Sequence, residues 1–353
     1  MILHIFLYDK FSHDYIEKIN ELFDPKQHIF WNYGTLPSAE IRSVKTENSL
    51  FNLQYKSKIC ELYHLYRLML KADIIIAHSL FVPKSYLLLF DIFITFRKKF
   101  FWNIWGGDLY DAYWERKDSI KLRIREIFRR YFIRKLKYVG YIPGDYTFLK
   151  EHYKTKAIFF LESYIYDFFV PRVEADESDK ESINILLGNS ATETSQYEKS
   201  IDMLIKYVER PIKVKCILSY PKKNATYREK IIRYGREKLG EKFVPIVDFM
   251  TYEKYTELLS GIDIAIFNHN RQQALGNIAS LLYLGKRIFI NPENACKSYF
   301  EAIGAKVFST ENLTEEDICK KNDLGMAEKN RKAIDVFFSD SEFYKRWSKV
   351  FEL

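Results

Sequence analysis

The sequence predicts an α/β protein made of two Rossmann-like domains that face a cleft. Short apolar runs alternate with longer amphipathic ones, which is typical of parallel sheets covered by helices. A charged stretch around residues 173–182, almost free of large apolar residues, interrupts the alternation, which restarts at residue 183. A chain of 353 residues is also too long for one typical core and about right for two domains.

The first domain is expected to span residues 1–172. Its strands are predicted at 2–7, 29–33, 74–78, 100–105, 138–142 and 157–161, and its helices at 12–23, 57–71, 84–97, 118–136 and 145–152. The second domain is expected to span 183–324, after a linker at 173–182. Its strands are predicted at 183–188, 212–218, 243–247, 262–267 and 287–290, and its helices at 194–208, 225–238, 252–260, 274–284 and 296–303. A long C-terminal helix within 325–353 is expected to cross back to the first domain.

Charge is divided unevenly between the two predicted domains. The net charge is +8, and residues 1–172 hold 27 Lys and Arg against 19 Asp and Glu, whereas residues 173–353 hold 28 of each kind. A one-sided basic surface suggests an anionic partner: membrane lipid, lipid pyrophosphate or nucleic acid. The four cysteines are widely spaced, which favours reduced thiols over a zinc or disulfide framework.

A polar turn follows the predicted strand at 100–105. It contains Trp105, Gly106, Gly107, Asp108 and Tyr110, which we expect to line the acceptor side of the cleft. Ligands of open parallel sheets bind where strands end in such turns. A carboxylate sheltered by tryptophans can have a raised pKa and act as a general base, so Asp108 is the first candidate catalytic residue. The alternative is an ordinary helix-capping or turn aspartate.

Three further polar residues follow strands of the first domain. Asp9 and His13 come just after the first strand, and His78 ends the strand at 74–78. All three are expected to project into the cleft, with His13 and His78 as candidate catalytic groups and Asp9 as a candidate acceptor contact. A structural role is the alternative for each of them.

A second polar turn, Gly188, Asn189 and Ser190, follows the first strand of the second domain. We expect it to open a helix whose backbone N–H groups face the phosphates of a donor. Tyr220 and Phe249 also follow strands of this domain and are candidates for bordering the base or sugar, with packing roles as the alternative.

Another candidate donor segment is Arg271, Gln272 and Gln273, followed by Gly276 and Asn277 at the start of an apolar helix. Arginine forks onto phosphate oxygens, and glutamine reads sugar hydroxyls or a base edge. The chain has no Asp-x-Asp pair, the usual holder of a divalent ion on a nucleotide diphosphate. The absence of Gly-x-Gly-x-x-Gly disfavours a nicotinamide or flavin enzyme. We therefore expect no metal or other cofactor.

The run from Arg116 to Lys137 contains ten basic and two acidic residues, with apolar residues at helical spacing. This pattern is typical of a basic amphipathic helix lying on an anionic membrane. Arg125, Arg129, Arg130 and Arg134 are the residues expected to face it. A surface helix that packs its apolar stripe in the core is the alternative, and both can hold.

In these segments the chain resembles glycosyltransferase family 56. The matching stretches are FWNIWGGDLY (101–110), ILLGNSATETS (185–195), SYP (219–221), RQQALGN (271–277) and LGKRIFINPEN (284–294). The resemblance covers about residues 1–310. It implies the glycosyltransferase-B fold and places Asp108, the Gly188 turn and Arg271 to Gln273 on matching positions.

The resemblance also implies the substrates. The donor would be a dTDP-linked amino-deoxysugar of the Fuc4NAc type, and the acceptor an undecaprenyl-pyrophosphate-linked glycan at the cytoplasmic face of a bacterial inner membrane. A UDP-linked donor in capsule or O-antigen assembly is the alternative. A nucleotide-sugar epimerase and a nucleic-acid binder are less favoured. Nucleic-acid binding would leave both polar turns unexplained. No nucleic-acid partner is expected.

Overall fold

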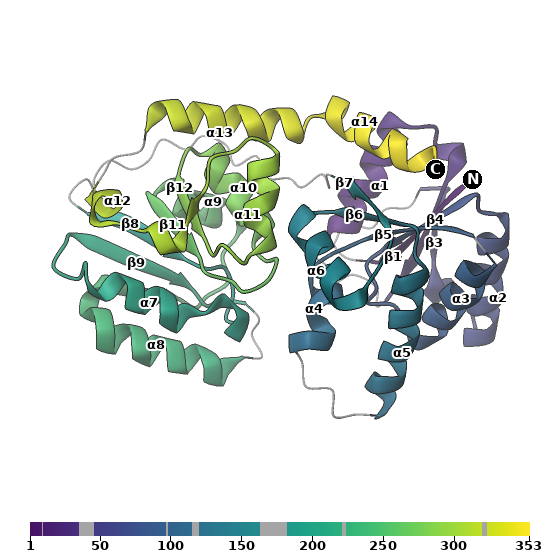
Figure 1. Ribbon diagram of the computed structural model, residues 1–353, viewed down its shortest axis with the longest axis horizontal. Coiled ribbons are helices and arrows are strands. Elements are labelled where there is room, and N and C mark those ends of the chain that lie inside the picture. Colours follow the sequence, from purple (N-terminus) through teal and green to yellow (C-terminus); the bar gives the residue numbers. More distant parts are fainter. Residues whose placement is uncertain are drawn as a thin grey trace. The chain divides into compact units, whose positions relative to one another are not determined.

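The computed structural model describes residues 1–8, 10–34, 46–96, 98–114, 120–162, 182–220, 224–319 and 323–353. The chain forms two compact units. Unit 1 consists of Met1–Tyr166 and Phe338–Leu353, and unit 2 of Asp167–Phe337. Each unit contains one parallel sheet with helices on both faces (Figure 1).

The sheet of unit 1 has seven strands in the order β3-β2-β1-β4-β5-β6-β7. They are β1 (Ile2–Leu7), β2 (His28–Tyr33), β3 (Ser49–Phe51), β4 (Ile74–His78), β5 (Lys99–Asn103), β6 (Tyr138–Tyr141) and β7 (Ile158–Leu161). Every recorded pairing is parallel. The central strands β1 and β4 are buried along almost their whole length because both faces of the sheet are covered.

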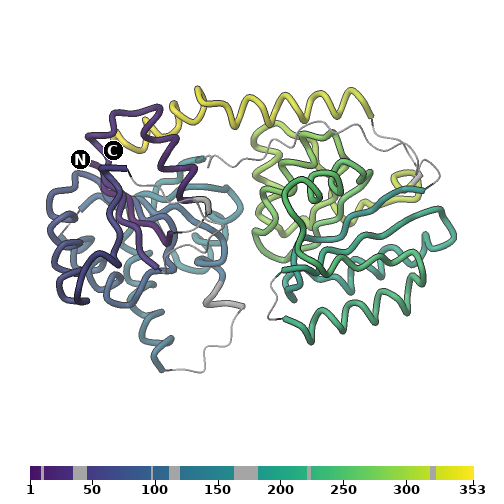
Figure 2. The backbone as a smooth tube through the Cα atoms, turned by 180° about the vertical axis from the view of Figure 1, so that it is seen from behind, coloured from purple at the N-terminus to yellow at the C-terminus, as the bar shows by residue number. Residues whose placement is uncertain are grey.

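Helices cover both faces of this sheet. The described α-helices of unit 1 are α1 (Lys10–Leu22), α2 (Lys58–Lys71), α3 (Lys84–Thr95), α4 (Gly107–Trp114), α5 (Ile120–Lys135), α6 (Pro143–Tyr153) and α14 (Asp340–Phe351). Residues of α2, α3, α5 and α6 share one core cluster with Ile5, Ile75 and Trp102 of the strands. Helices α1 and α14 cover the opposite face and run side by side, where Tyr15 and Trp347 lie 5.1 Å apart between ring centroids (Figure 2).

The sheet of unit 2 has six strands in the order β10-β9-β8-β11-β12-β13. They are β8 (Ile183–Leu187), β9 (Ile212–Ile217), β10 (Phe243–Ile246), β11 (Ile264–Phe267), β12 (Arg287–Ile290) and β13 (Phe308–Ser309). The described α-helices are α7 (Tyr197–Ile205), α8 (Ala225–Leu239), α9 (Tyr252–Ser260), α10 (Leu275–Tyr283), α11 (Ala295–Ala302), α12 (Glu315–Cys319) and α13 (Leu324–Phe337).

Each strand order reverses once, between β1 and β4 in unit 1 and between β8 and β11 in unit 2. Loops that leave the carboxyl ends of strands at such a switch point diverge to opposite faces, and the space between them takes ligands. In unit 2 the switch point lies between the Gly188 turn after β8 and the Arg271 segment after β11. The sheet topology therefore places the two sequence-predicted donor segments after the carboxyl ends of adjacent strands.

Some elements differ from the sequence-based expectation. The single helix expected near 325–350 is two helices, α13 and α14, because the Ser339 hydroxyl caps a new helix by accepting from Glu342 N at 3.3 Å. The strand expected at 100–105 ends at Asn103, and the following turn leads into α4, which the sequence did not predict. No helix in the described part of the chain is long and apolar enough to cross a membrane.

Candidate functional site

In unit 1, Asp108 ties together the loops that follow β4 and β5. Its Oδ2 accepts from Leu80 N at 2.8 Å and from Trp102 Nε1 at 2.9 Å, and its Oδ1 accepts from Trp105 N at 2.9 Å. The side chain is 2% exposed. Burial raises the pKa of this carboxyl, while the three hydrogen bonds and Arg129 oppose the rise. In this arrangement Asp108 orients two loops.

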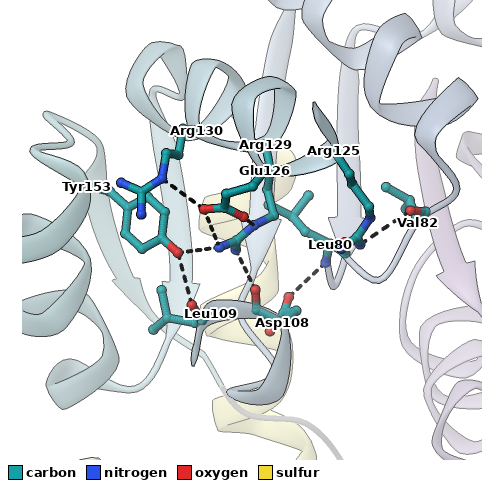
Figure 3. Close-up of polar contacts among 9 residues, drawn as sticks. All are labelled: Leu80, Val82, Asp108, Leu109, Arg125, Glu126, Arg129, Arg130 and Tyr153. Atoms are coloured by element: carbon teal, nitrogen blue, oxygen red, sulfur yellow. Dashed lines mark hydrogen bonds and ion pairs between the residues drawn. The ribbon is translucent and has the colours of Figure 1, made fainter. Parts of the chain in front are cut away.

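Two arginines of α5 donate hydrogen bonds to the backbone of the same region (Figure 3). Arg125 Nη2 donates to Leu80 O at 2.7 Å, and Arg129 Nη1 donates to Asp108 O at 2.5 Å. Arg129 also pairs with Glu126 at 2.7 Å and donates to the Tyr153 hydroxyl.

The expected outward orientation of the four arginines is therefore corrected for two of them. Arg129 is 1% exposed, and Arg125 is directed at backbone carbonyls. Both guanidinium groups donate to backbone carbonyls, of Leu80 and of Asp108, which explains why they do not face outward. Arg134 is exposed, and Arg130 is partly exposed and pairs with Glu126 at 3.0 Å.

The carboxyl edge of unit 1 carries backbone strain. Ser79 after β4 and Tyr141 at the end of β6 have φ values of 89° and 121°, which are costly for residues with a Cβ. Between them, Gly106 after β5 has φ 78°. Gly107 lies under the Phe81 ring, where an added Cβ would be 2.9 Å from Cζ. Strain of this kind clusters at functional sites, which makes this loop cluster a candidate site.

The other residues of unit 1 that the sequence suggested as site residues occupy several different positions. Tyr110 is buried and donates to Asp145 Oδ1 at 2.7 Å, and Trp105 is half-buried. His13 on α1 is buried, with Nδ1 3.4 Å from Glu17 Oε2. Asp9 lies outside the described residues.

His78 belongs to a row of three buried histidines, two of which the sequence analysis did not single out. His78 Nε2 lies 3.0 Å from His4 Nδ1, and His4 Nε2 lies 3.0 Å from His28 Nδ1. Burial lowers the pKa of all three, to about 4 for His28. The row lies on the sheet face that α1 and α14 cover, and Phe351 of α14 contacts both His4 and His28. At neutral pH the three imidazoles are therefore uncharged, and their role is structural.

In unit 2, Gln273 joins the two predicted donor segments. Its Nε2 donates to Asn189 Oδ1 at 3.0 Å and to Ser190 Oγ at 2.5 Å, and its Oε1 accepts from Thr194 Oγ1 at 2.9 Å. Backbone groups reinforce the junction, because Gly188 N donates to Ile266 O at 3.0 Å. Residues more than 80 positions apart thus form one polar surface at the β8/β11 switch point.

Only glycine fits at position 188 of this turn. Gly188 has φ 57°, and an added Cβ would lie 2.6 Å from the Tyr197 ring. The turn does not open α7 directly, as the sequence suggested. A 3-10 helix, Glu193–Ser195, intervenes, and α7 begins at Tyr197, whose hydroxyl accepts from Ser190 N at 3.2 Å. Hydroxyls rather than a helix terminus therefore shape this half of the site.

The other half of the site is the start of α10. Ala274 precedes the helix with φ 65°, so Gly276 and Asn277 lie in its first turn, where backbone N–H groups favour an anion. Arg271 Nη1 donates to Gln272 O at 3.1 Å, which directs the guanidinium back along the same segment. Asn277 hydrogen-bonds Tyr255.

Two aromatic candidates of unit 2 are exposed. Tyr220 follows β9, and its carbonyl accepts from Ala191 N at 2.5 Å, which places Tyr220 beside the Gly188 turn. Phe249 is exposed in the segment between β10 and α9. Within the described ranges, no group of three or more His, Cys, Asp or Glu side chains is arranged to hold a metal ion.

A model of one protein family, described as 4-alpha-L-fucosyltransferase, glycosyl transferase group 56, matches residues 69–353. The chain belongs to glycosyl transferase group 56. It is a glycosyltransferase, and the family resemblance found in the sequence is confirmed. The matched range includes the Asp108 loop and the whole polar surface around Gln273.

Solved glycosyltransferases share the fold of this group 56 enzyme at low sequence identity. A glycosyltransferase from Rickettsia africae is 14% identical with TM-score 0.64, and the match covers 99% of this chain and 97% of that one. Anabaena HepE, solved in complex with UDP and glucose, is 10% identical with TM-score 0.66 and 99% coverage of both chains. A sucrose-phosphate synthase from Thermosynechococcus elongatus is 9% identical with TM-score 0.68, covering 99% and 98%. The two Rossmann-like domains are those of the glycosyltransferase-B fold.

Sequence reasoning missed two buried polar residues of this group 56 enzyme. Asn103 ends β5 beside the Asp108 loop, fully buried, and neither of its amide atoms has a hydrogen-bond partner in the described part of the chain. His269, also fully buried, follows β11 near Arg271, and both of its ring nitrogens lack partners there. Each directly follows or ends an apolar strand, and that position was the available signal.

Proposed function

We propose that this glycosyltransferase moves a Fuc4NAc-like amino-deoxysugar from a dTDP-sugar to an undecaprenyl-pyrophosphate-linked glycan. The acceptor hydroxyl attacks the anomeric carbon, the bond to the diphosphate breaks, the hydroxyl proton passes to a base, and dTDP leaves. Membership of group 56 supports the transfer of a deoxysugar. The proposed setting is the cytoplasmic face of a bacterial inner membrane, with the chain bound peripherally; the basic excess of residues 1–172 supports an anionic surface.

The observation that carries the donor assignment is the Gln273 junction. Its amide fixes Asn189 and Ser190 opposite the start of α10, at the switch point of a parallel sheet. A diphosphate there would meet hydroxyls and backbone N–H groups from the turn and from the first turn of α10. Arg271 would supply fixed positive charge to the leaving group, so we propose that transfer needs no divalent ion.

On the acceptor side, the strained loops after β4 and β5 are the proposed site. Asp108 was the first candidate base, and its three donors favour a positioning role for the loop that holds the acceptor. A UDP-linked donor is the second candidate, since Anabaena HepE has the same fold and was solved with UDP and glucose. The two donors differ in the base, and binding measurements separate them.

A nucleotide panel on the wild type and on Arg271→Ala tests the donor assignment. Bound ligand raises apparent stability by mass action. We expect dTDP to raise the melting temperature more than UDP does. Arg271→Ala should weaken dTDP binding by roughly 2–4 kcal/mol if the charge pair is desolvated, while thymidine, which lacks phosphates, binds both proteins equally.

The matched control is Arg236→Ala, which removes the same charge from an exposed position on α8 in the same unit. It should bind dTDP like the wild type. Unchanged dTDP affinity in Arg271→Ala would place the diphosphate elsewhere, and a strict magnesium requirement for transfer would contradict the metal-free proposal. Stronger stabilisation by UDP than by dTDP would favour the second donor.

A further inference from the structure

An apolar groove runs between α3 and α5 on unit 1. Its volume is about 490 Å³, and its apolar walls are Leu88, Ile92 and Phe96 on one side and Ile127, Phe128 and Tyr131 on the other. Phe96 and Ile127 are 79% and 66% exposed. Apolar side chains gathered in this way on a soluble protein mark an interaction surface.

The rim of the groove is positively charged. Lys84 lies over the Phe128 ring at 5.7 Å from its centroid, and Lys135 lies over the Tyr131 ring at 6.0 Å. Lys121, Arg123 and Arg134 are also exposed on α5. Apolar walls with a cationic rim match the chemistry of an anionic lipid bilayer, whose headgroups pair with the rim while its chains contact the walls.

Each of the two helices contains one acidic residue, and neither adds an exposed negative charge to the rim. Glu126 of α5 is turned inward to Arg129 and Arg130. Asp91 of α3 lies in the groove, 8% exposed, and neither of its carboxyl oxygens has a hydrogen-bond partner in the described part of the chain.

Among the described residues, no neighbouring charge compensates the Asp91 carboxylate. From α5, the groove contributes one titratable group, the Tyr131 hydroxyl, which lies 2.9 Å from Thr95 Oγ1. From α3, Thr95 donates to the backbone O of Asp91 at 2.7 Å instead of to its carboxyl. Lys84 and Lys135 lie over aromatic rings at the rim. Burial alone raises the pKa of Asp91 to about 7.

We propose that the α3–α5 groove is the surface through which this chain contacts an anionic lipid bilayer, and that Asp91 must be neutral for the contact to form. The proposal deepens the proposed function, since a bilayer is where a lipid-linked acceptor is held. Covering an ionised, unpartnered carboxylate with lipid chains would cost its remaining hydration. A protonated carboxyl has a much smaller cost.

The sign of the pH effect follows from this difference. Near pH 6 most Asp91 is neutral and the groove accepts the bilayer, whereas near pH 8 about nine in ten carboxyls are ionised. If only the neutral form binds, apparent affinity falls about tenfold between these conditions. Generic attraction between basic residues and anionic lipid lacks this step, because Lys and Arg keep their charge throughout.

Vesicle co-sedimentation of the full chain tests the proposal without donor or acceptor. The vesicles contain phosphatidylcholine with or without phosphatidylglycerol. We expect the wild type to bind phosphatidylglycerol vesicles about tenfold more weakly near pH 8 than near pH 6. Asp91→Asn, isosteric and always neutral, should bind near pH 8 as the wild type binds near pH 6. Asp335→Asn, the same change at an exposed position on α13, should keep the wild-type profile.

Ile127→Ser tests the walls, with Val336→Ser on α13 as the matched exposed apolar control. Ile127→Ser should reduce vesicle binding severalfold at both pH values, and the control should not. An unchanged pH profile in Asp91→Asn, or equal binding to vesicles without phosphatidylglycerol, overturns the proposal. So does self-association of the wild type that Ile127→Ser abolishes, which would make the groove an interface between copies. Donor binding to unit 2, measured separately with dTDP, is unaffected by any of these results.

Discussion

At the residue scale, the hydrogen-bond donors around Asp108 explain why this position requires an aspartate. Two backbone N–H groups and one indole N–H occupy its oxygens, and these donors come from the loops after β4 and β5 and from β5 itself. A neutral amide cannot satisfy all three, because its nitrogen would face at least one N–H group. The aspartate is therefore required by the loop geometry, whatever else it does.

Asp108→Asn should lower the stability of unit 1 by about 1–3 kcal/mol, the cost of leaving a buried donor unsatisfied. Transfer activity should fall with it. All five tryptophans lie in unit 1, so tryptophan fluorescence during urea unfolding reports that unit alone. If unit 1 unfolds as in the wild type while transfer falls by roughly 100-fold or more, Asp108 is a general base after all.

At the scale of elements, α5 performs different tasks on its two sides. Arg125 and Arg129 point inward to backbone carbonyls at the carboxyl edge of the sheet (Figure 3). Arg134, on the same helix, is exposed. The pattern of basic residues in the sequence does not reveal this division, because inward and outward arginines have the same spacing.

Two substitutions on α5 separate the inward from the outward role. Arg129→Gln should destabilise unit 1 by about 3 kcal/mol, since it breaks a buried charged network. Arg134→Gln should change stability by less than about 0.5 kcal/mol and weaken binding to anionic vesicles by about 1 kcal/mol. Fluorescence-detected unfolding and vesicle co-sedimentation measure the two effects. Equal destabilisation by both variants would contradict the division.

The histidine row is the other element-scale feature, and it makes unit 1 sensitive to acid. Burial lowers the pKa of His4, His28 and His78 in the folded state, so the unfolded chain binds more protons below its ordinary histidine pKa of about 6.5. The stability of the neutral row is therefore complete above that pH and is lost as pH falls. The loss for His28 continues to its folded pKa of about 4.

Each imidazole contributes about 1.4 kcal/mol of lost stability per pH unit in that window. His28→Phe removes one imidazole, so the slope of unit 1 stability against pH between about 6 and 4.5 should decrease by that amount. Other groups, such as Asp91 and Glu162, change stability with pH in the opposite direction, because burial raises their pKa values. Their contribution is the same in both proteins, so it cancels when the two slopes are compared. An identical slope in the variant would show that His28 is already protonated in the folded chain.

At the scale of the whole molecule, the sequence predicted what local pattern encodes. The strands at 2–7 and 74–78 are confirmed because short, mostly apolar runs bounded by polar turns specify buried parallel strands. The α4 helix was missed because Gly106 and Gly107 suggest a turn without a helix after it. The break between α13 and α14 was missed because both helices have similar periodicity, and one serine decides the boundary.

The site was predictable only in part for the same reason. Position after a strand pointed to Asn189, Ser190 and the Arg271 segment, and the sheet topology places them after adjacent strands. The contact that joins them, Gln273 to Ser190, spans 83 residues and leaves no local signature. Nor does the sequence reveal that Arg129 is buried, since burial depends on which loop lies opposite.

The return of α14 to the first sheet has a consequence for biosynthesis. The strands of unit 1 leave the ribosome before unit 2, but Trp347 and Phe351, which cover the histidine face of their sheet, are translated after unit 2. Unit 2 is synthesised in between as one continuous segment. The nascent chain therefore holds the first sheet without α14 on its aromatic face until unit 2 has been synthesised, so the unit that is begun first is completed after the other one.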